Sequence, residues 1–151
     1  SRTAYFGEHT FETAQEAYTR ALAIAQREND SKLELRTLVN GSYLETFHGN
    51  FQEATEMSLR GLDLARRVDN RRVELGAYQW ATFVRLIIGD LQGAKSNLES
   101  FRDLAEKLQD RNWLATAYFL SAQSSIYEGD WEAARHFSDR AWRACPWTAD
   151  A

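Results

Sequence analysis

The chain has 151 residues, of which 44% are hydrophobic and 26% charged, enough for one globular domain with a sizeable core. Its formal net charge of −4 argues against a protein that binds nucleic acid through overall positive charge. A single cysteine, Cys145, excludes an internal disulfide and a cysteine-based zinc cluster. One proline and eight glycines are too few for a turn-rich β-sandwich, so helices are favoured.

Seven helices are expected along the chain, because apolar residues recur at spacings of three and four. The expected ranges are about 10–28, 31–48, 51–68, 71–88, 91–108, 111–128 and 131–145. The range 71–88 is apolar almost all round, so we expect this helix to be packed between neighbours.

A period of forty residues relates these helices. Gly49, Gly89 and Gly129 align, each followed by Asn or Asp, and alanine recurs at positions 14, 54, 94 and 134. Such self-similarity is typical of stacked helix pairs. The expected repeat pairs cover about 31–70, 71–110 and 111–147, after a half repeat at 1–30, in a single domain of residues 1–151.

The turns between the expected helices carry matching signals. The three aligned glycines can take the left-handed conformation that ends a helix, and the Asn or Asp after each can cap the next one. Asp30, Asn70 and Asp110 precede the other helices as candidate caps. Ser31 and Glu34 have the spacing of a capping box.

Four features together resemble the tetratricopeptide repeat: the Gly-Asp or Gly-Asn pair, the aromatic residue or leucine two positions after the glycine, the alanine five positions after it, and a tyrosine in the first helix of a pair. The resemblance covers nearly the whole chain. It implies an all-α fold, an α-α superhelix or solenoid of about seven antiparallel helices. Two features depart from the family. The period is forty residues rather than about 34, and Arg85 or Ser125 stands where the family often has a tyrosine.

The forty-residue form resembles the sensor regions of large bacterial ATP-dependent transcription activators and related signalling proteins. In the tetratricopeptide family the first helices of successive pairs line a concave groove. Carried onto this sequence, the resemblance places nine residues there: Arg36, Val39, Asn40, Tyr43, Gln79, Trp80, Phe83, Phe119 and Gln123. Aromatic rings beside amides suit a peptide or a sugar-like small ligand. The alternative is that many of these side chains pack between helices.

Glu45 and Arg85 are forty residues apart and occupy equivalent positions in adjacent repeats. Their charges are opposite, and the helices that carry them are expected to pack against neighbours. We therefore expect a partly buried ion pair that aligns two repeats.

Motifs for catalysis are absent from the sequence: it has no phosphate-binding glycine-rich loop, nucleophile elbow or zinc-protease helix. His9, His48 and His136 do not have the spacing of metal ligands. We therefore expect no enzyme, no cofactor, and no catalytic or metal-binding residue. The arginines between 66 and 72 surround a helix end, where positive charge is favourable, so no direct contact with nucleic acid is expected.

The sequence favours a non-catalytic scaffold that binds a protein, a peptide or a small ligand, as a sensor or regulatory segment of a bacterial signalling or transcription regulator. The alternative is a structural segment that self-associates as a homodimer through its terminal helices, because Phe137, Ala141 and Trp142 would leave an apolar end.

The chain starts with Ser1 rather than Met, so we expect either processing of the N-terminus or a fragment of a longer protein. We expect no signal peptide from its first residues, and no apolar run reaches the roughly 18 residues of a membrane helix. We therefore expect a cytoplasmic protein without membrane contact.

Overall fold

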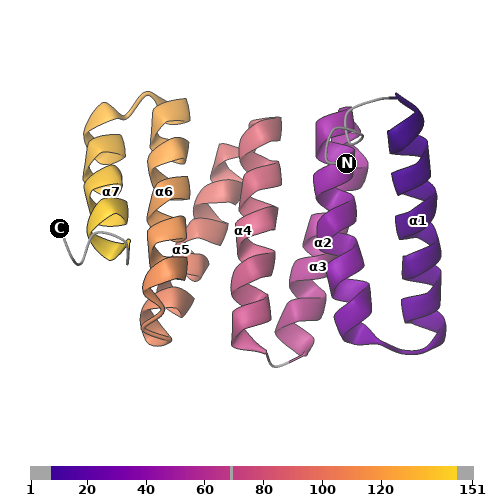
Figure 1. Cartoon of the computed structure of the whole chain (residues 1–151). Coiled ribbons are helices and arrows are strands. Elements are labelled where there is room, and N and C mark those ends of the chain that lie inside the picture. Colours follow the sequence, from indigo (N-terminus) through magenta and orange to yellow (C-terminus); the bar gives the residue numbers. More distant parts are fainter. Residues whose placement is uncertain (1–7, 69, 146–151) are drawn as a thin grey trace. The chain divides into compact units, whose positions relative to one another are not determined.

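The computed structural model describes residues 8–68 and 70–145, and every regular element in these two ranges is an α-helix (Figure 1). The helices are α1 (Glu8–Arg27), α2 (Ser31–His48), α3 (Phe51–Arg67), α4 (Arg71–Ile88), α5 (Leu91–Lys107), α6 (Arg111–Glu128) and α7 (Trp131–Ala144). The predicted all-α class and the seven expected helices are confirmed, and each boundary lies within two residues of its expected position.

The chain divides into two compact units, residues 1–69 and 70–151. The described part of the first unit holds α1, α2 and α3, and that of the second holds α4 to α7. The division falls at the end of the first expected repeat pair. The expected single domain of residues 1–151 stays a prediction.

In the first unit, α2 packs against both α1 and α3. The backbone of α3 comes close to the buried Leu35 and Leu38 of α2 at Gly61. A methyl group added at Gly61 would lie 3.7 Å from side-chain atoms of both leucines. Elsewhere in the same interface, Gly41 of α2 leaves space for the side chain of Met57 on α3, because a methyl group added at Gly41 would overlap it. Small residues on one helix opposite large ones on the next therefore let these helices pack closely.

In the second unit, α6 packs against α5 and α7 and also contacts α4. The core centres on Phe101 of α5, whose ring centroid lies 6.3 Å from that of Tyr78 on α4 and 6.0 Å from that of Trp113 on α6. Toward α7, Tyr118 stacks on Phe137 with ring centroids 6.4 Å apart. Aromatic residues of four helices thus hold this unit together.

The glycines at the ends of α2, α4 and α6 act as the sequence predicts. Gly49, Gly89 and Gly129 have φ angles of 82°, 80° and 77°, in the left-handed region. The ends of α1 and α5 use the same region without glycine, at Asn29 (φ 53°) and Gln109 (φ 52°). No glycine marked these two turns in the sequence.

The expected capping box at the start of α2 is wrong. The carboxylate of Asp30 accepts the backbone N–H groups of Lys32 and Leu33 at 3.1 Å and 3.0 Å, so Asp30 caps the helix instead of Ser31. Glu34, the other half of the expected box, pairs with Arg60 of α3 at 2.5 Å. The acidic residue directly before the helix satisfies the first-turn donors that a capping box would satisfy.

Candidate functional site

The α2 residues expected in a groove share one exposed face of the first unit. Arg36, Asn40 and Tyr43 are exposed, and Val39 is half-buried. The Tyr43 ring, 43% exposed, lies beside that of Phe47 with centroids 4.6 Å apart. This face therefore presents two neighbouring aromatic rings to solvent.

The second unit presents residues at the equivalent helix positions. On α4, Gln79, Trp80 and Phe83 are half-buried, and the rings of Trp80 and Phe83 meet edge to face at 5.9 Å. On α6, Phe119 is 61% exposed, and Gln123 donates a hydrogen bond to the hydroxyl of Tyr127 at 3.3 Å. None of the nine predicted groove residues is buried. Their role in binding stays a prediction.

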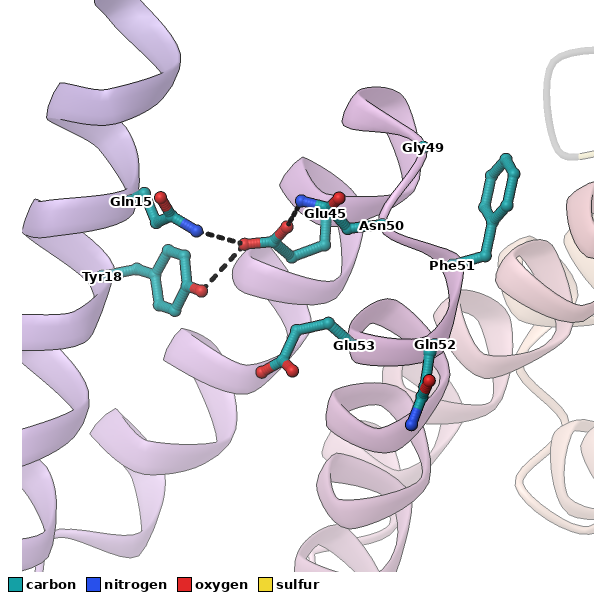
Figure 2. Close-up of a pocket in the computed structure, with 8 residues that line it drawn as sticks. All are labelled: Gln15, Tyr18, Glu45, Gly49, Asn50, Phe51, Gln52 and Glu53. Carbon is teal, nitrogen blue, oxygen red and sulfur yellow. Dashed lines mark hydrogen bonds between the residues drawn. The ribbon is translucent and has the colours of Figure 1, made fainter.

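A polar cavity of about 750 Å³ lies in the first unit, where α2 ends and α3 begins (Figure 2). It is lined by Gln15, Tyr18, Glu45, Gly49, Asn50, Phe51, Gln52 and Glu53. Of these residues, Glu45 was expected from the sequence to form an ion pair, and Gly49 and Asn50 to form the turn between two helices.

The carboxylate of Glu45 is the centre of this cavity's hydrogen bonding. Although the residue is 1% exposed, it accepts from the Tyr18 hydroxyl at 2.8 Å, the Gln15 amide at 3.3 Å and the Asn50 amide at 2.6 Å. These three donors are neutral, and they come from α1 and from the turn after α2 (Figure 2). A buried carboxyl group with such donors avoids the large cost of an unpaired polar group.

The Tyr18 hydroxyl responds to this environment. Desolvation by burial, followed by its hydrogen bond to Glu45 and the charges of Glu45 and Glu53, raises the pKa of Tyr18 to about 12. The carboxylate of Glu53 extends from the first turn of α3 toward α1, on the same side as Tyr18 (Figure 2). Two carboxylates thus act on one phenol.

Asn50 has a different role from the one that its position predicts. It precedes α3, but its side chain makes no capping hydrogen bond and donates to Glu45 instead. Asp90 and Asp130, at equivalent positions, do cap their helices through Gly93 and Ala133. The hydrogen bond to the buried carboxylate of Glu45 therefore replaces a cap at the start of α3.

The expected ion pair between Glu45 and Arg85 would join the two units, and it stays a prediction. Within the second unit, the Arg85 guanidinium lies 3.7 Å from the Asp90 carboxylate. It also lies against Gly93, where any side chain would meet it. Each of the two residues therefore has polar neighbours inside its own unit.

A second, smaller cavity of about 130 Å³ lies between α5, α6 and α7. Both of its cations contact other residues of the chain: Lys95 lies 3.4 Å from Glu128, and Arg102 donates to the Ser121 hydroxyl at 3.1 Å. The Arg102 guanidinium also lies 5.2 Å from the centre of the Phe137 ring. Cations and carboxylates of the chain itself occupy this space.

An apolar hollow of about 400 Å³ lies between α6 and α7, lined by Ala115, Thr116, Phe119, Ser138, Ala141, Trp142 and Cys145. Of the three residues expected to leave an apolar end, Trp142 is 70% exposed, whereas Phe137 and Ala141 are half-buried. The expected apolar surface at this end is therefore carried mainly by Trp142.

Within residues 8–68 and 70–145, no three or more His, Cys, Asp or Glu side chains are grouped so as to hold a metal ion. None of the described helices is long and apolar enough to cross a membrane. No protein-family model matches the chain, and a search of curated proteins finds no match.

Proposed function

We propose that this chain is a non-catalytic binding scaffold of the tetratricopeptide type, each of whose two units binds peptide or protein segments on the exposed face of its first helices, α2 in the first unit and α4 and α6 in the second. The observation that carries the proposal is the exposure of large aromatic side chains on these faces of α2 and α6. Tyr43 is 43% exposed, Phe119 61% and Tyr127 50%. Other positions on the same helices, such as Leu38 and Tyr118, are buried.

The chemistry of the face favours a peptide. Its rings bury a large area while losing few rotatable bonds, and the amides of Asn40, Gln79 and Gln123 can orient a peptide backbone. Exposed aromatic residues are the side chains that most often supply the energy of a protein interface. The proposal places the chain in a cytoplasmic bacterial regulator, as the resemblance to sensor regions implies.

A selection of short peptides displayed on phage tests this function. Peptides selected on the wild type should bind saturably, and Tyr43→Ala and Tyr127→Ala should each weaken them by about tenfold, as loss of an aromatic anchor does. Trp131→Ala is the matched control, because Trp131 is 67% exposed at the start of α7 and lies off the face. Equal binding by all four proteins would contradict the proposal.

Self-association through the terminal helices is the second candidate, and the exposure of Trp142 beside the apolar hollow favours it. It predicts a mass in light scattering that rises with protein concentration and falls back in Trp142→Ala. A constant monomer mass would remove this candidate and leave the peptide-binding proposal in place.

A further inference from the structure

The apolar hollow between α6 and α7 corresponds to a place in the same unit that is filled one repeat earlier, between α4 and α5. Counted back by forty residues, its lining corresponds to Leu75, Gly76, Gln79, Leu98, Phe101, Arg102 and Ala105. Helix α6 packs over this earlier place. The Trp113 ring of α6 lies there, with its centroid 6.0 Å from that of Phe101 and an atom 3.7 Å from a methyl group added at Gly76. The two places can therefore be compared position by position.

Small residues in the hollow replace large ones of the earlier place. Three large side chains between α4 and α5 are buried, with at most 2% exposed: Leu75, Leu98 and Phe101. Their counterparts in the hollow are Ala115, Ser138 and Ala141. Thr116 stands for Gly76 and adds only a small side chain. A space of about 400 Å³ is thus left where the preceding repeat is closely packed.

Two polar residues of the earlier place become exposed aromatic residues in the hollow. Gln79 corresponds to Phe119, which is 61% exposed, and Arg102 corresponds to Trp142, which is 70% exposed. The hollow therefore lies between two aromatic side chains that are accessible from solvent. Such rings stabilise a complex when an apolar side chain of a partner packs between them.

The surroundings of the hollow are positively charged, although the whole chain has a net charge of −4. The helix segments that carry its lining, residues 111–119 and 134–145, contain four arginines and one aspartate. The guanidinium of Arg111 lies near Cys145, since it donates to the Arg143 carbonyl at 3.2 Å. Among the described side chains, neither Arg111 nor Arg135 forms an ion pair. A partner with acidic residues beside its apolar side chain is complementary to this surface.

We propose that the hollow between α6 and α7 binds an acidic peptide segment through one tryptophan side chain. The indole takes the place that the Trp113 ring occupies one repeat earlier, and it packs against Phe119 and Trp142. Aspartate or glutamate residues on either side of the tryptophan face Arg111 and Arg135. Arg135 lies three residues before Ser138, on the same face of α7.

This site is additional to the faces of the first helices. Of the nine predicted groove residues, Phe119 alone lines it, and the rest of its lining comes from α7 and from the first half of α6. Tyr43 and Tyr127, which test the proposed function, do not line it.

Titration of the ¹⁵N-labelled chain with the peptide acetyl-Asp-Asp-Trp-Asp-Asp-amide tests the proposal. The backbone amide signals of Ala115, Ala141 and Cys145 report on the hollow, which these residues line. We expect these signals to shift saturably. A peptide with alanine in place of the tryptophan should bind about tenfold more weakly, and one with lysine in place of each aspartate about fivefold more weakly. Added salt should narrow the difference between the aspartate and lysine peptides.

Two substitutions on α7 localise the binding. Ala141→Phe introduces the residue that the preceding repeat has at this position, Phe101, so it should fill the hollow and weaken the aspartate peptide about tenfold. The hollow opens to solvent beside Trp142, so the fold should persist, as the ¹⁵N spectrum of the variant will show. Ala144→Phe is the matched control, because Ala144 is also half-buried on α7 but does not line the hollow. It should leave the affinity unchanged.

The proposal is overturned if the signals do not saturate at about 10 mM of the aspartate peptide. Equal affinity for the aspartate and lysine peptides, or an equal effect of Ala141→Phe and Ala144→Phe, would overturn it as well. So would two results that assign the hollow to another occupant. One is a mass that rises with concentration in the wild type but not in Ala141→Phe, which indicates a second copy of the chain. The other is tighter binding of the peptide by Trp147→Ala, which indicates competition from residues 146–151, outside the described ranges.

These outcomes are distinguishable from a failure of the proposed function. Tyr43→Ala and Tyr127→Ala should leave the affinity for the aspartate peptide unchanged, and Ala141→Phe should leave binding at Tyr43 unchanged.

Discussion

At the scale of single residues, one repeat position carries a different chemistry in each copy. Glu45 accepts from three neutral donors, Arg85 lies near Asp90, and Ser125 bonds to a carbonyl of its own helix. The residue five positions later changes with it, from Asn50 to aspartate in the other two copies. The residue at this turn position is therefore asparagine only in the copy whose helix carries the buried Glu45.

Asn50→Asp should destabilise the protein by about 1–3 kcal/mol, because it places a carboxylate where an amide now donates to Glu45 at 2.6 Å. Asp130→Asn is the matched reverse substitution. Asp130 caps α7, and Asn and Asp cap about equally well, so its effect should stay within about 0.5 kcal/mol. Urea unfolding of both variants measures the difference. A neutral Asn50→Asp would show that Glu45 does not need this donor.

The raised pKa of Tyr18 predicts a dependence of stability on alkaline pH. The folded protein holds the phenolic proton up to about 12, whereas the ordinary pKa is 10.0. The stabilisation is therefore complete below pH 10 and is lost as the pH rises through the folded-state value. Tyr18→Phe has no proton to lose at this position.

The free energy of unfolding of the wild type should consequently fall, relative to that of Tyr18→Phe, as the pH rises from about 10 to about 12. Tyr118, whose pKa is also raised by burial and by its hydrogen bond to Glu106, is present in both proteins and cancels from the comparison. Parallel pH profiles of the two proteins would contradict the Tyr18–Glu45 hydrogen bond.

The residues of the aromatic face could be placed from the sequence, whereas the polar cavity could not. The resemblance to the tetratricopeptide repeat placed Tyr43 and Phe119 on an open face, and both side chains are exposed. The donors to Glu45 lie 30 and 27 residues before it, at Gln15 and Tyr18. Their counterparts are Lys95 and Leu98, so the repeat itself gave no signal for them. A buried acidic residue on a packed helix was the one available clue.

At the scale of helices, the residues at the helix ends predicted where each helix begins and ends. Left-handed glycines end α2, α4 and α6, and aspartate or asparagine precedes the helices, so the boundaries could be read directly. The exceptions have local causes. Asn29 and Gln109 take positive φ angles without being glycine, and the Asn50 side chain donates to Glu45 and does not cap α3. Side-chain competition of this kind depends on packing, which a periodic pattern does not specify.

The same substitution should have opposite effects at two glycines. Gly61→Ala adds a methyl group at ordinary contact distance from Leu35 and Leu38, 3.7 Å away, and it removes a flexible residue from the interior of α3. It should stabilise the protein by about 0.5–1 kcal/mol. Gly89→Ala meets no neighbour within 4 Å but forces alanine to a φ of 80°, which should cost about 1–2 kcal/mol. Urea unfolding of both variants tests the pair, and effects of equal sign would contradict it.

At the scale of the whole molecule, the repeat pattern predicted helix order and pairing within each unit. The division at residues 69 and 70 was not expected, although it coincides with the boundary between the first two repeat pairs. In a periodic sequence, all boundaries between repeat pairs carry the same pattern of residues. Which of them separates two compact units depends on the particular side chains that meet there, and the forty-residue pattern does not distinguish them.

The central claim is that the chain binds peptides through the exposed faces of its first helices, α2 in the first unit and α4 and α6 in the second. Hydrogen exchange measured by mass spectrometry, with and without a phage-selected peptide, tests it most directly. The account predicts slower exchange confined to these three helices, over segments that include Tyr43, Phe83 and Phe119. Slower exchange in α3, α5 and α7 alone, with the first helices unchanged, would contradict the account.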